Sequence, residues 1–151
     1  MTTTTEVPWY VTKRGELLAK QFLFELDPND LVYTGDHPEH FFDYMILYLK
    51  SDGSPVTIAM TVKPTEEEIK GVYPVKVSEL NRLKNANIPV LMLVIDVKQN
   101  HYFFNWVQEV TQSEELAIAN SDELDQSILI PLRHGTTEEI QKLKQEILAI
   151  N

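Results

Sequence analysis

Three residues in the first half of the chain have side chains of the types that metal-dependent phosphodiester chemistry needs. They are Glu16, Asp43 and Lys63. Carboxylate oxygens suit Mg²⁺ and Mn²⁺ as ligands, and a bound divalent cation lowers the pKa of a water molecule. A lysine beside such a water orients it or stabilises the phosphate charge. The three side chains can act together only if the fold brings them to one point.

Glu16 is expected on an amphipathic helix over residues 12–26. Thr12 is a good N-cap residue, and Asp27 and Pro28 follow the last apolar position. The expected packing stripe repeats at helical spacing and consists of Leu17, Leu18, Phe22, Leu23 and Leu26. Glu16 lies at the border of this stripe, so its carboxylate either leans toward the sheet or pairs with Lys20 on the surface.

Asp43 and Lys63 are expected on two neighbouring strands. Strands are predicted at residues 31–34, 41–50 and 55–63, and the last two form a hairpin. Asp43 shares its strand face with apolar side chains, where an unpaired carboxylate is costly, and this favours a functional role. The alternative is that Asp43 belongs to an exposed strand end and is solvated. Lys63 ends its strand, where a solvated lysine is common.

The register of this hairpin decides whether Asp43 and Lys63 can meet. Asp52-Gly53 is typical of a two-residue turn, and such a turn would place Asp43 opposite Val62, on the sheet face away from Lys63. A connection of three or five residues, or a bulge, would instead bring Asp43 beside Thr61 or Lys63 on one face. A working site requires the second arrangement.

The rest of the chain predicts an α/β fold with a central mixed sheet and helices on both faces. The apolar run at residues 89–97 is typical of a strand buried on both faces, which places it centrally. Thr136, followed by Glu138 and Glu139, predicts a capped final helix that reaches Ile150. The other expected elements are a helix at 78–86 capped by Ser78, strands at 101–106 and 128–132, the start of a helix at 106–112 and a loop at 113–127.

The composition is that of a soluble globular protein. Of the 151 residues 43% are hydrophobic and 24% are charged, so we expect one domain over residues 1–151, with a core at about 12–106 and a C-terminal strand and helix at about 128–150. Because cysteine is absent, disulfides and thiolate metal sites are excluded, and a cytoplasmic protein is expected. No apolar run reaches membrane-spanning length, so no membrane partner is expected.

Other groups of side chains are weaker candidates. Metal-capable side chains gather at residues 36–40, a segment whose composition is typical of a turn. The glutamates at 66–68 could replace a carboxylate missing elsewhere, although an acidic run is usually solvated. Arg133 and His134 fit a strand exit better than a proton-transfer site. The aromatic side chains at 101–106 could stack on bases, but core packing explains them more simply.

The order of elements, together with Gly15-Glu16, Phe42-Asp43 and Thr61-Val62-Lys63, resembles the PD-(D/E)XK restriction-endonuclease-like superfamily. The resemblance covers residues 12 to about 106 and is closer to small bacterial nuclease-like domains. It implies a core of a helix, three strands, a helix and a strand. It also implies that Asp43 and Glu16 hold Mg²⁺ or Mn²⁺ in an active enzyme and that Lys63 is catalytic. Thr61 stands where the superfamily carries a third, usually acidic, ligand.

The departure at Thr61 predicts a degenerate nuclease-like domain that is weakly active or inactive. A hydroxyl in place of a carboxylate weakens the binding of a divalent cation. The formal net charge of −10 opposes the phosphate contacts on which nucleic-acid affinity mostly depends, so any binding of nucleic acid is expected to be weak. The alternative is a non-catalytic protein-interaction or accessory module in a mobile-element or defence system. A protein partner and a homodimer both stay open.

Overall fold

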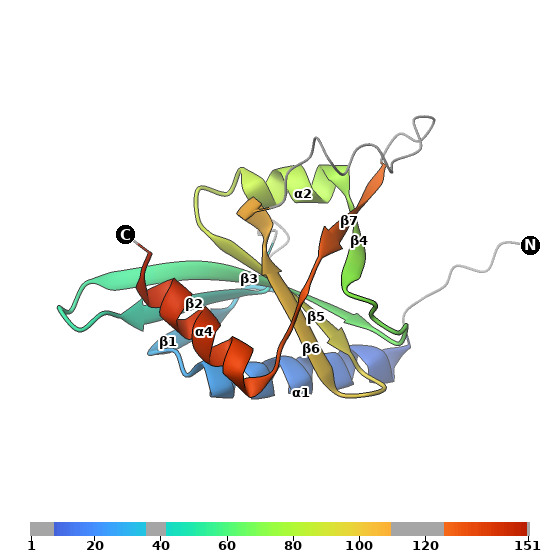
Figure 1. The fold of residues 1–151 in the computed structure, drawn as a ribbon, viewed down its shortest axis with the longest axis horizontal. Helices are drawn as coiled ribbons and strands as arrows, with labels where there is room; N and C mark the ends of the chain where they lie inside the picture. Colours follow the sequence, from blue (N-terminus) through green and yellow to red (C-terminus); the bar gives the residue numbers. More distant parts are fainter. Residues whose placement is uncertain (1–7, 36–41, 110–125, 151) are drawn as a thin grey trace, which may run out of the picture.

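The computed structural model describes residues 8–35, 42–109 and 126–150 (Figure 1). Within these residues three helices and eight strands follow one another, with a short 3-10 helix, η1, after the sixth strand. In chain order the elements are α1 (Trp9–Leu26), β1 (Asp30–Tyr33), β2 (Tyr44–Leu49), β3 (Pro55–Thr65), β4 (Val72–Lys76), α2 (Val77–Lys84), β5 (Val90–Asp96), β6 (His101–Trp106), η1 (Val107–Glu109), β7 (Ser127–Pro131), β8 (Arg133–His134) and α4 (Thr137–Leu148).

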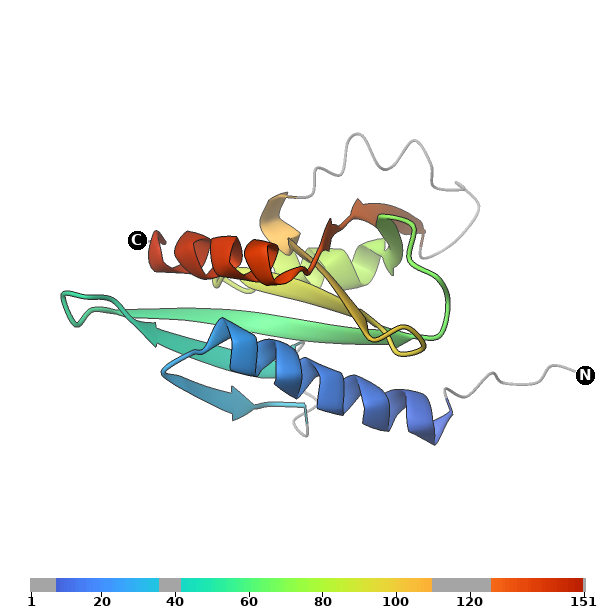
Figure 2. The ribbon, with the colours of Figure 1, turned by 60° about the horizontal axis from the view of Figure 1, so that its bottom comes forward.

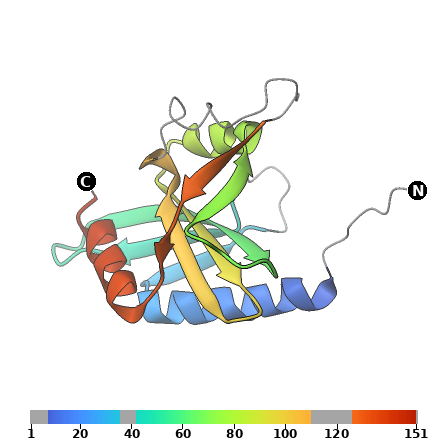
Figure 3. The same ribbon diagram turned by 45° about the vertical axis from the view of Figure 1, so that its right-hand side comes forward.

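The main sheet has six strands in the order β1-β2-β3-β5-β6-β8. Strands β3 and β5 are parallel and the other neighbours are antiparallel, so the predicted mixed α/β sheet is confirmed. Every residue of β5 is buried, as the unbroken apolar run predicts for a strand covered on both faces. A second sheet pairs β4 with β7, and Figure 3 shows these two strands side by side in front of β5 and β6.

Helices cover both faces of the main sheet, also as predicted. The first core contains the apolar faces of α1 and α4 with alternate residues of β2 and β3, including Ile46 and Ile58. The second core contains α2, β4 and β7 with the opposite residues of β3 and β5, including Ala59 and Met92. Figure 2 shows α1 beneath the sheet and α2 above it. Side chains of β3 therefore alternate between the α1 face and the α2 face.

Helix α1 differs from its prediction at its first turn and on its exposed side. It begins at Trp9 rather than Thr12, and the Pro8 carbonyl accepts the backbone N–H groups of Val11 and Thr12 at 3.0 and 3.4 Å. Burial of Val11 explains the extra turn, because it adds one more packing position. Leu17 was expected in the packing stripe, but its side chain is 65% exposed.

The observed boundaries of three other elements also differ from the predicted ones. Strand β2 begins at Tyr44 rather than residue 41, β3 continues through Thr65, and α2 begins at Val77 rather than after a Ser78 cap. Strand β4 was not predicted, because its pairing with β7 is long-range and Pro74 argues locally against a strand. The Thr136 cap is confirmed: its hydroxyl accepts the Glu139 N–H at 3.2 Å.

Several predictions fall partly or wholly outside the described residues. They are the metal-capable loop at 36–40, the first residue of the strand expected at 41–50, the end of the helix expected at 106–112 and most of the loop expected at 113–127. In the described part of that helix, Val107–Glu109 forms η1. Within the described ranges, no helix is long and apolar enough to cross a membrane.

Candidate functional site

The β2–β3 hairpin has the register that brings Asp43 and Lys63 to one face. Lys50 and Ser54 flank a three-residue loop, with the Lys50 N–H donating to the Ser54 carbonyl at 2.8 Å and the Gly53 N–H to the Lys50 carbonyl at 2.9 Å. Tyr44 consequently pairs with Met60, and one step further Asp43 lies opposite Thr61. Directly opposed residues share a sheet face, and Lys63 is two residues beyond Thr61.

Of the two connections that the sequence left open, the structure therefore has the three-residue loop and not the two-residue turn at Asp52-Gly53, for a local reason. The Asp52 carboxylate accepts both the backbone N–H and the hydroxyl of Ser54, at 2.9 and 2.6 Å. Gly53 adopts a φ of 85°, in the region where a side chain is disfavoured. A three-residue loop with glycine in this conformation is a common hairpin connection. Relative to a two-residue turn, this loop shifts the register by one residue and places Asp43 on the same sheet face as Thr61 and Lys63.

The Asp43 carboxylate is half-buried and links the start of β2 to β3 at the end of the hairpin away from its loop. Its Oδ2 accepts the backbone N–H of Val62 at 2.7 Å, while the Asp43 N–H donates to the Met60 carbonyl at 2.8 Å. Burial raises the pKa of this carboxyl above its usual value. The Val62 N–H, the charge of Lys63 and the Thr61 hydroxyl act in the opposite direction.

A second carboxylate reaches the same place from α2. The Lys63 ammonium forms an ion pair with Glu79, and both side chains are about one-quarter exposed, at 26% and 27%. The negative charge of Glu79 also contributes to the raised pKa of Asp43. Asp43, Lys63 and Glu79 therefore form one electrostatic cluster on the α2 face of the hairpin, which we call the Asp43 cluster.

Sequence reasoning missed Glu79 because α2 follows an unpredicted strand. Glu79 lies in the first turn of this helix, directly before the buried Leu80. A carboxylate in a first turn is favoured by the helix dipole and needs no further explanation from sequence. One sequence feature could have identified Glu79: it flanks the apolar face of α2, and this face packs on β3 and β5.

Glu16 lies on α1, which covers the other face of the sheet. Of the two alternatives for Glu16, a surface ion pair is found, but with Lys13 rather than Lys20: the Glu16 Oε2 is 3.4 Å from the Lys13 ammonium. At the preceding residue the helix is so close to β3 that a Cβ on Gly15 would be 2.7 Å from the Pro64 Cβ. Among the described residues, therefore, the structure joins Asp43 to Lys63 and does not bring Glu16 into the Asp43 cluster.

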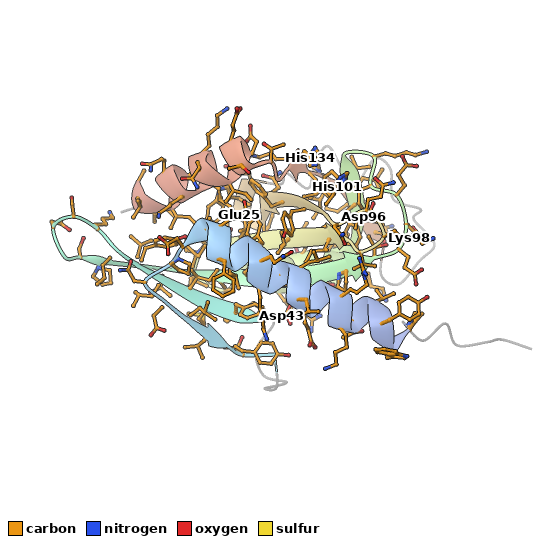
Figure 4. All side chains as sticks on the ribbon, turned by 90° about the horizontal axis from the view of Figure 1, so that it is seen from below. Glu25, Asp43, Asp96, Lys98, His101 and His134 are labelled. Carbon is orange, nitrogen blue, oxygen red and sulfur yellow. The ribbon has the colours of Figure 1, made fainter. Side chains whose placement is uncertain are left out.

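Tyr44 nevertheless connects the two carboxylates electrostatically. Its ring is buried on the α1 face, where it lines a groove together with Glu16. Burial raises the pKa of the Tyr44 hydroxyl, and Tyr33, Asp43 and Glu16 raise it further. Asp43 and Glu16 thus both act on Tyr44 from their different elements. Figure 4 shows Asp43 at the side of α1 opposite to Asp96, His101 and His134.

The Asp43 cluster lacks the third carboxylate of a strong chelating site. Thr61 is buried beside Asp43 and offers only a hydroxyl. Within the described part of the chain, no group of three or more His, Cys, Asp or Glu side chains could together hold a metal ion. Mg²⁺, however, is often held by one or two carboxylates and otherwise by water and substrate phosphates. The Asp43 and Glu79 oxygens fit such a weakly held ion.

The other candidates have structural partners. Glu66 accepts a hydrogen bond from the Tyr10 hydroxyl at 3.0 Å, and Glu67 and Glu68 are exposed. Arg133 does more than end a strand: it makes a two-pronged contact with Glu146, at 2.9 and 2.8 Å, and a bond of 3.0 Å to Glu139. These contacts tie β8 to α4.

The two histidines on neighbouring strands also pack rather than converge on a ligand. The His134 ring stacks on Phe103 with centroids 4.9 Å apart, and its centroid is 5.2 Å from that of His101. The nearby Asp96 is buried and its Oδ1 accepts the backbone N–H groups of Lys98 and Gln99, both at 3.0 Å. Asp96 therefore stabilises the turn between β5 and β6.

Comparison with known proteins finds a similar structure but no similar sequence. No protein-family model and no curated protein sequence matches the chain. Among solved structures, the chain is similar to D212, a nuclease from a fusselovirus, with a TM-score of 0.56 and 14% sequence identity. The match covers 93% of this chain and 99% of that one. At this level of identity the shared property is the fold.

Proposed function

We propose that this protein is a degenerate nuclease-like domain of the PD-(D/E)XK type, with weak or no metal-dependent phosphodiesterase activity. The observation that carries the proposal is the hairpin register, which puts Asp43 and Lys63 on one face and within electrostatic reach of each other. The likeness in fold to a viral nuclease supports it. The resemblance of Phe42-Asp43 and Thr61-Val62-Lys63 to the superfamily motif points the same way.

Glu79 and Asp43 are the residues that we assign to a divalent cation, Mg²⁺ or Mn²⁺. When bound, such an ion supplies a water molecule of lowered pKa as the nucleophile. Lys63 at present neutralises the charge that a cation would neutralise, because its ammonium pairs with Glu79 and favours the ionised form of Asp43. In the presence of a phosphodiester, the same ammonium would bind a non-bridging phosphate oxygen.

Three features argue that any activity is low. Thr61 supplies no carboxylate, and the burial that raises the pKa of Asp43 also disfavours the ionised form that binds a metal. The net charge of −10 weakens the sequence-independent attraction to nucleic acid. We therefore expect the purified protein to cleave duplex DNA little or not at all with Mg²⁺ or Mn²⁺ at physiological salt.

Binding of Mn²⁺, followed by its electron paramagnetic resonance signal, tests the assignment of ligands. Asp43→Asn and Glu79→Gln should each weaken binding by about tenfold, since each removes a charged oxygen ligand. Glu16→Gln is the matched control on α1 and should leave binding unchanged. If Glu16→Gln weakens binding and Glu79→Gln does not, the ligand pattern of the superfamily holds and our assignment of Glu79 is wrong.

Cleavage assays separate a degenerate nuclease from the two other interpretations. Cleavage by the wild type that disappears in both Asp43→Asn and Lys63→Met would make the protein an active nuclease and contradict its degeneracy. Absence of both cleavage and Mn²⁺ binding would favour the alternative, a non-catalytic interaction module. The proposal expects measurable Mn²⁺ binding that depends on Asp43, with little or no cleavage.

A further inference from the structure

Exposed apolar side chains gather on one side of the molecule, on α1 and β1. Leu17 and Phe24 on α1 are 65% and 82% exposed, and Leu31 and Tyr33 on β1 are 40% and 48% exposed. Leu17 and Phe24 are seven residues apart and so lie on one stripe of the helix. Leu31 and Tyr33 pair with Ile46 and Tyr44, which point to the α1 face of the sheet. We call these four side chains the α1–β1 face.

A groove joins the two halves of this face. Its volume is about 660 Å³, and its walls include Lys20, Leu23 and Phe24 of α1 and Leu31, Tyr33 and Tyr44 of the sheet. Figure 2 shows β1 beside α1 at the lower side of the molecule. Phe24, the groove and the apolar side of β1 therefore form one continuous surface, and Leu17 lies two helical turns from Phe24 on the same stripe.

The size of the α1–β1 face matches one half of a stable protein interface. With roughly 200 Å² for each large apolar side chain, the four exposed fractions leave roughly 500 Å² of apolar surface. A monomer rarely exposes a contiguous apolar patch much larger than a few hundred Å². A stable interface buries about 800 Å² on each partner, of which about 65% is apolar in homodimers. The face thus supplies the apolar share of such an interface.

The edge of the sheet is open at the same place. Strand β1 pairs with β2 on one side, and on its other side no strand pairs with it among the described residues. All four residues of β1 are exposed, and none is a proline. Natural proteins usually cover or interrupt such an edge, because an edge strand can pair with a strand of another chain.

The arrangement of side chains on α1 suits a second copy of the same chain. Tyr10 and Phe24 lie equally far from Leu17 along the helix, so two antiparallel copies of α1 crossing at Leu17 set Tyr10 of each against Phe24 of the other. Arg14 does not oppose this approach, because its guanidinium bonds to the Val97 carbonyl at 2.9 Å and to Asn100 at 2.6 Å.

The charges near the groove are also balanced, although the chain as a whole is strongly acidic. Lys13 is paired with Glu16, and Asp27 lies 3.6 Å from Lys144. Lys20 adds a positive charge to the groove wall. Two copies can therefore approach through this face without setting their acidic surfaces against each other.

We propose that the α1–β1 face is the interface of a homodimer, with Leu17 on the two-fold axis. The proposal is independent of the nuclease assignment, because Lys63 and Glu79 lie on the opposite face of the sheet. Sedimentation equilibrium at about 100 µM protein should give a mass near 35 kDa, twice the 17.4 kDa of one chain. Phe24→Glu should reduce the mass to that of one chain.

Leu49→Glu is the matched control, because Leu49 is 49% exposed at the far end of the β2–β3 hairpin. It should leave the dimer intact. A monomeric wild type contradicts the proposal, as does a dimer that survives Phe24→Glu. A dimer that Leu49→Glu breaks places the interface elsewhere and also contradicts it.

A cross-link provides a second measurement that does not depend on a disruptive variant. The chain has no cysteine, so a single one introduced as Leu17→Cys can only pair with another copy. At the proposed two-fold axis it should form an intermolecular disulfide under mild oxidation, whereas Leu49→Cys should not. Equal cross-linking of both variants would contradict the assignment of the axis to Leu17.

Discussion

The Asp43 carboxylate accepts the backbone N–H of Val62 at 2.7 Å, at the point where the β2–β3 ladder ends. This bond gives Asp43 a structural role beside any role in catalysis, because it satisfies a backbone donor of β3 at a half-buried position. Loss of activity in a variant of Asp43 is therefore informative only when the bond to Val62 is kept.

We predict that Asp43→Ala and Asp43→Asn differ in stability. Asp43→Ala leaves the Val62 N–H without its acceptor and should lower the free energy of unfolding by about 1–3 kcal/mol. Asp43→Asn keeps an oxygen acceptor and should be at least as stable as the wild type at pH 7. Urea unfolding measures both values. Equal losses in the two variants would show that the hydrogen bond to Val62 contributes little.

The raised pKa of Asp43 predicts how the stability of the wild type, relative to Asp43→Asn, changes with pH. A folded-state pKa above the unfolded value of 3.8 means that the contribution of Asp43 is fully present below pH 3.8 and is lost as pH rises through the folded-state pKa. The stability of Asp43→Asn relative to the wild type should therefore increase from pH 3.5 to pH 7. A difference that is flat or decreases with pH would contradict the burial of this carboxyl.

Lys63 and Glu79 should move the pKa of Asp43 in opposite directions. Lys63→Met removes a neighbouring positive charge and should raise the pKa, whereas Glu79→Gln removes a negative charge and should lower it. The carboxyl carbon of Asp43, titrated by NMR, reports both changes. A pKa that neither variant alters would mean that the three side chains do not form one cluster in solution.

Arg133 should stabilise the protein mainly above pH 4.5. Hydrogen bonds from Arg133 lower the pKa of both Glu139 and Glu146, and the Trp106 indole N–H donates to Glu146 at 3.0 Å. A lowered pKa gives stability that is present above the unfolded value of 4.5 and is lost as pH falls through the folded-state pKa. Arg133→Met should lower the Tm by a few degrees at pH 7.

The gap in Tm between the wild type and Arg133→Met should narrow as the pH falls below 4.5. Lys142→Met is a suitable control, because Lys142 lies 3.5 Å from Glu139 on the exposed side of α4 and makes no bidentate contact. A loss of Tm that is the same at pH 3 and pH 7 would mean that Arg133 acts through packing on Phe104, 4.7 Å from its guanidinium, rather than through charge.

Local patterns predicted the elements whose burial follows from their own sequence. The apolar run at 89–97 indicated the central strand β5, and Thr136 with its following glutamates indicated the cap of α4. The same reasoning was wrong for Leu17, because helical spacing identifies an apolar residue without telling whether a partner covers it. Its exposure became visible only when α1 was packed on the sheet.

Features that depend on distant parts of the chain were not predictable in this way. Strand β4 exists through its pairing with β7, more than fifty residues later in the sequence. The sequence left two hairpin loops open. The hydrogen bond from the Ser54 N–H to the Asp52 carboxylate stabilises the three-residue loop, and the resulting register places Asp43 on the α2 face of the sheet. The ion pair between Glu79 and Lys63 likewise depends on the packing of α2 against β3.

The affinity of Thr61→Glu for Mn²⁺ tests most directly whether a residual nuclease site exists. Thr61 lies beside Asp43, so an added carboxylate should tighten binding about tenfold over the wild type. Thr61→Gln, of the same size without the charge, should not, and circular dichroism checks that both variants fold. If calorimetry finds the same affinity in Thr61→Glu, Thr61→Gln and the wild type, no metal site remains at this position and the account is wrong.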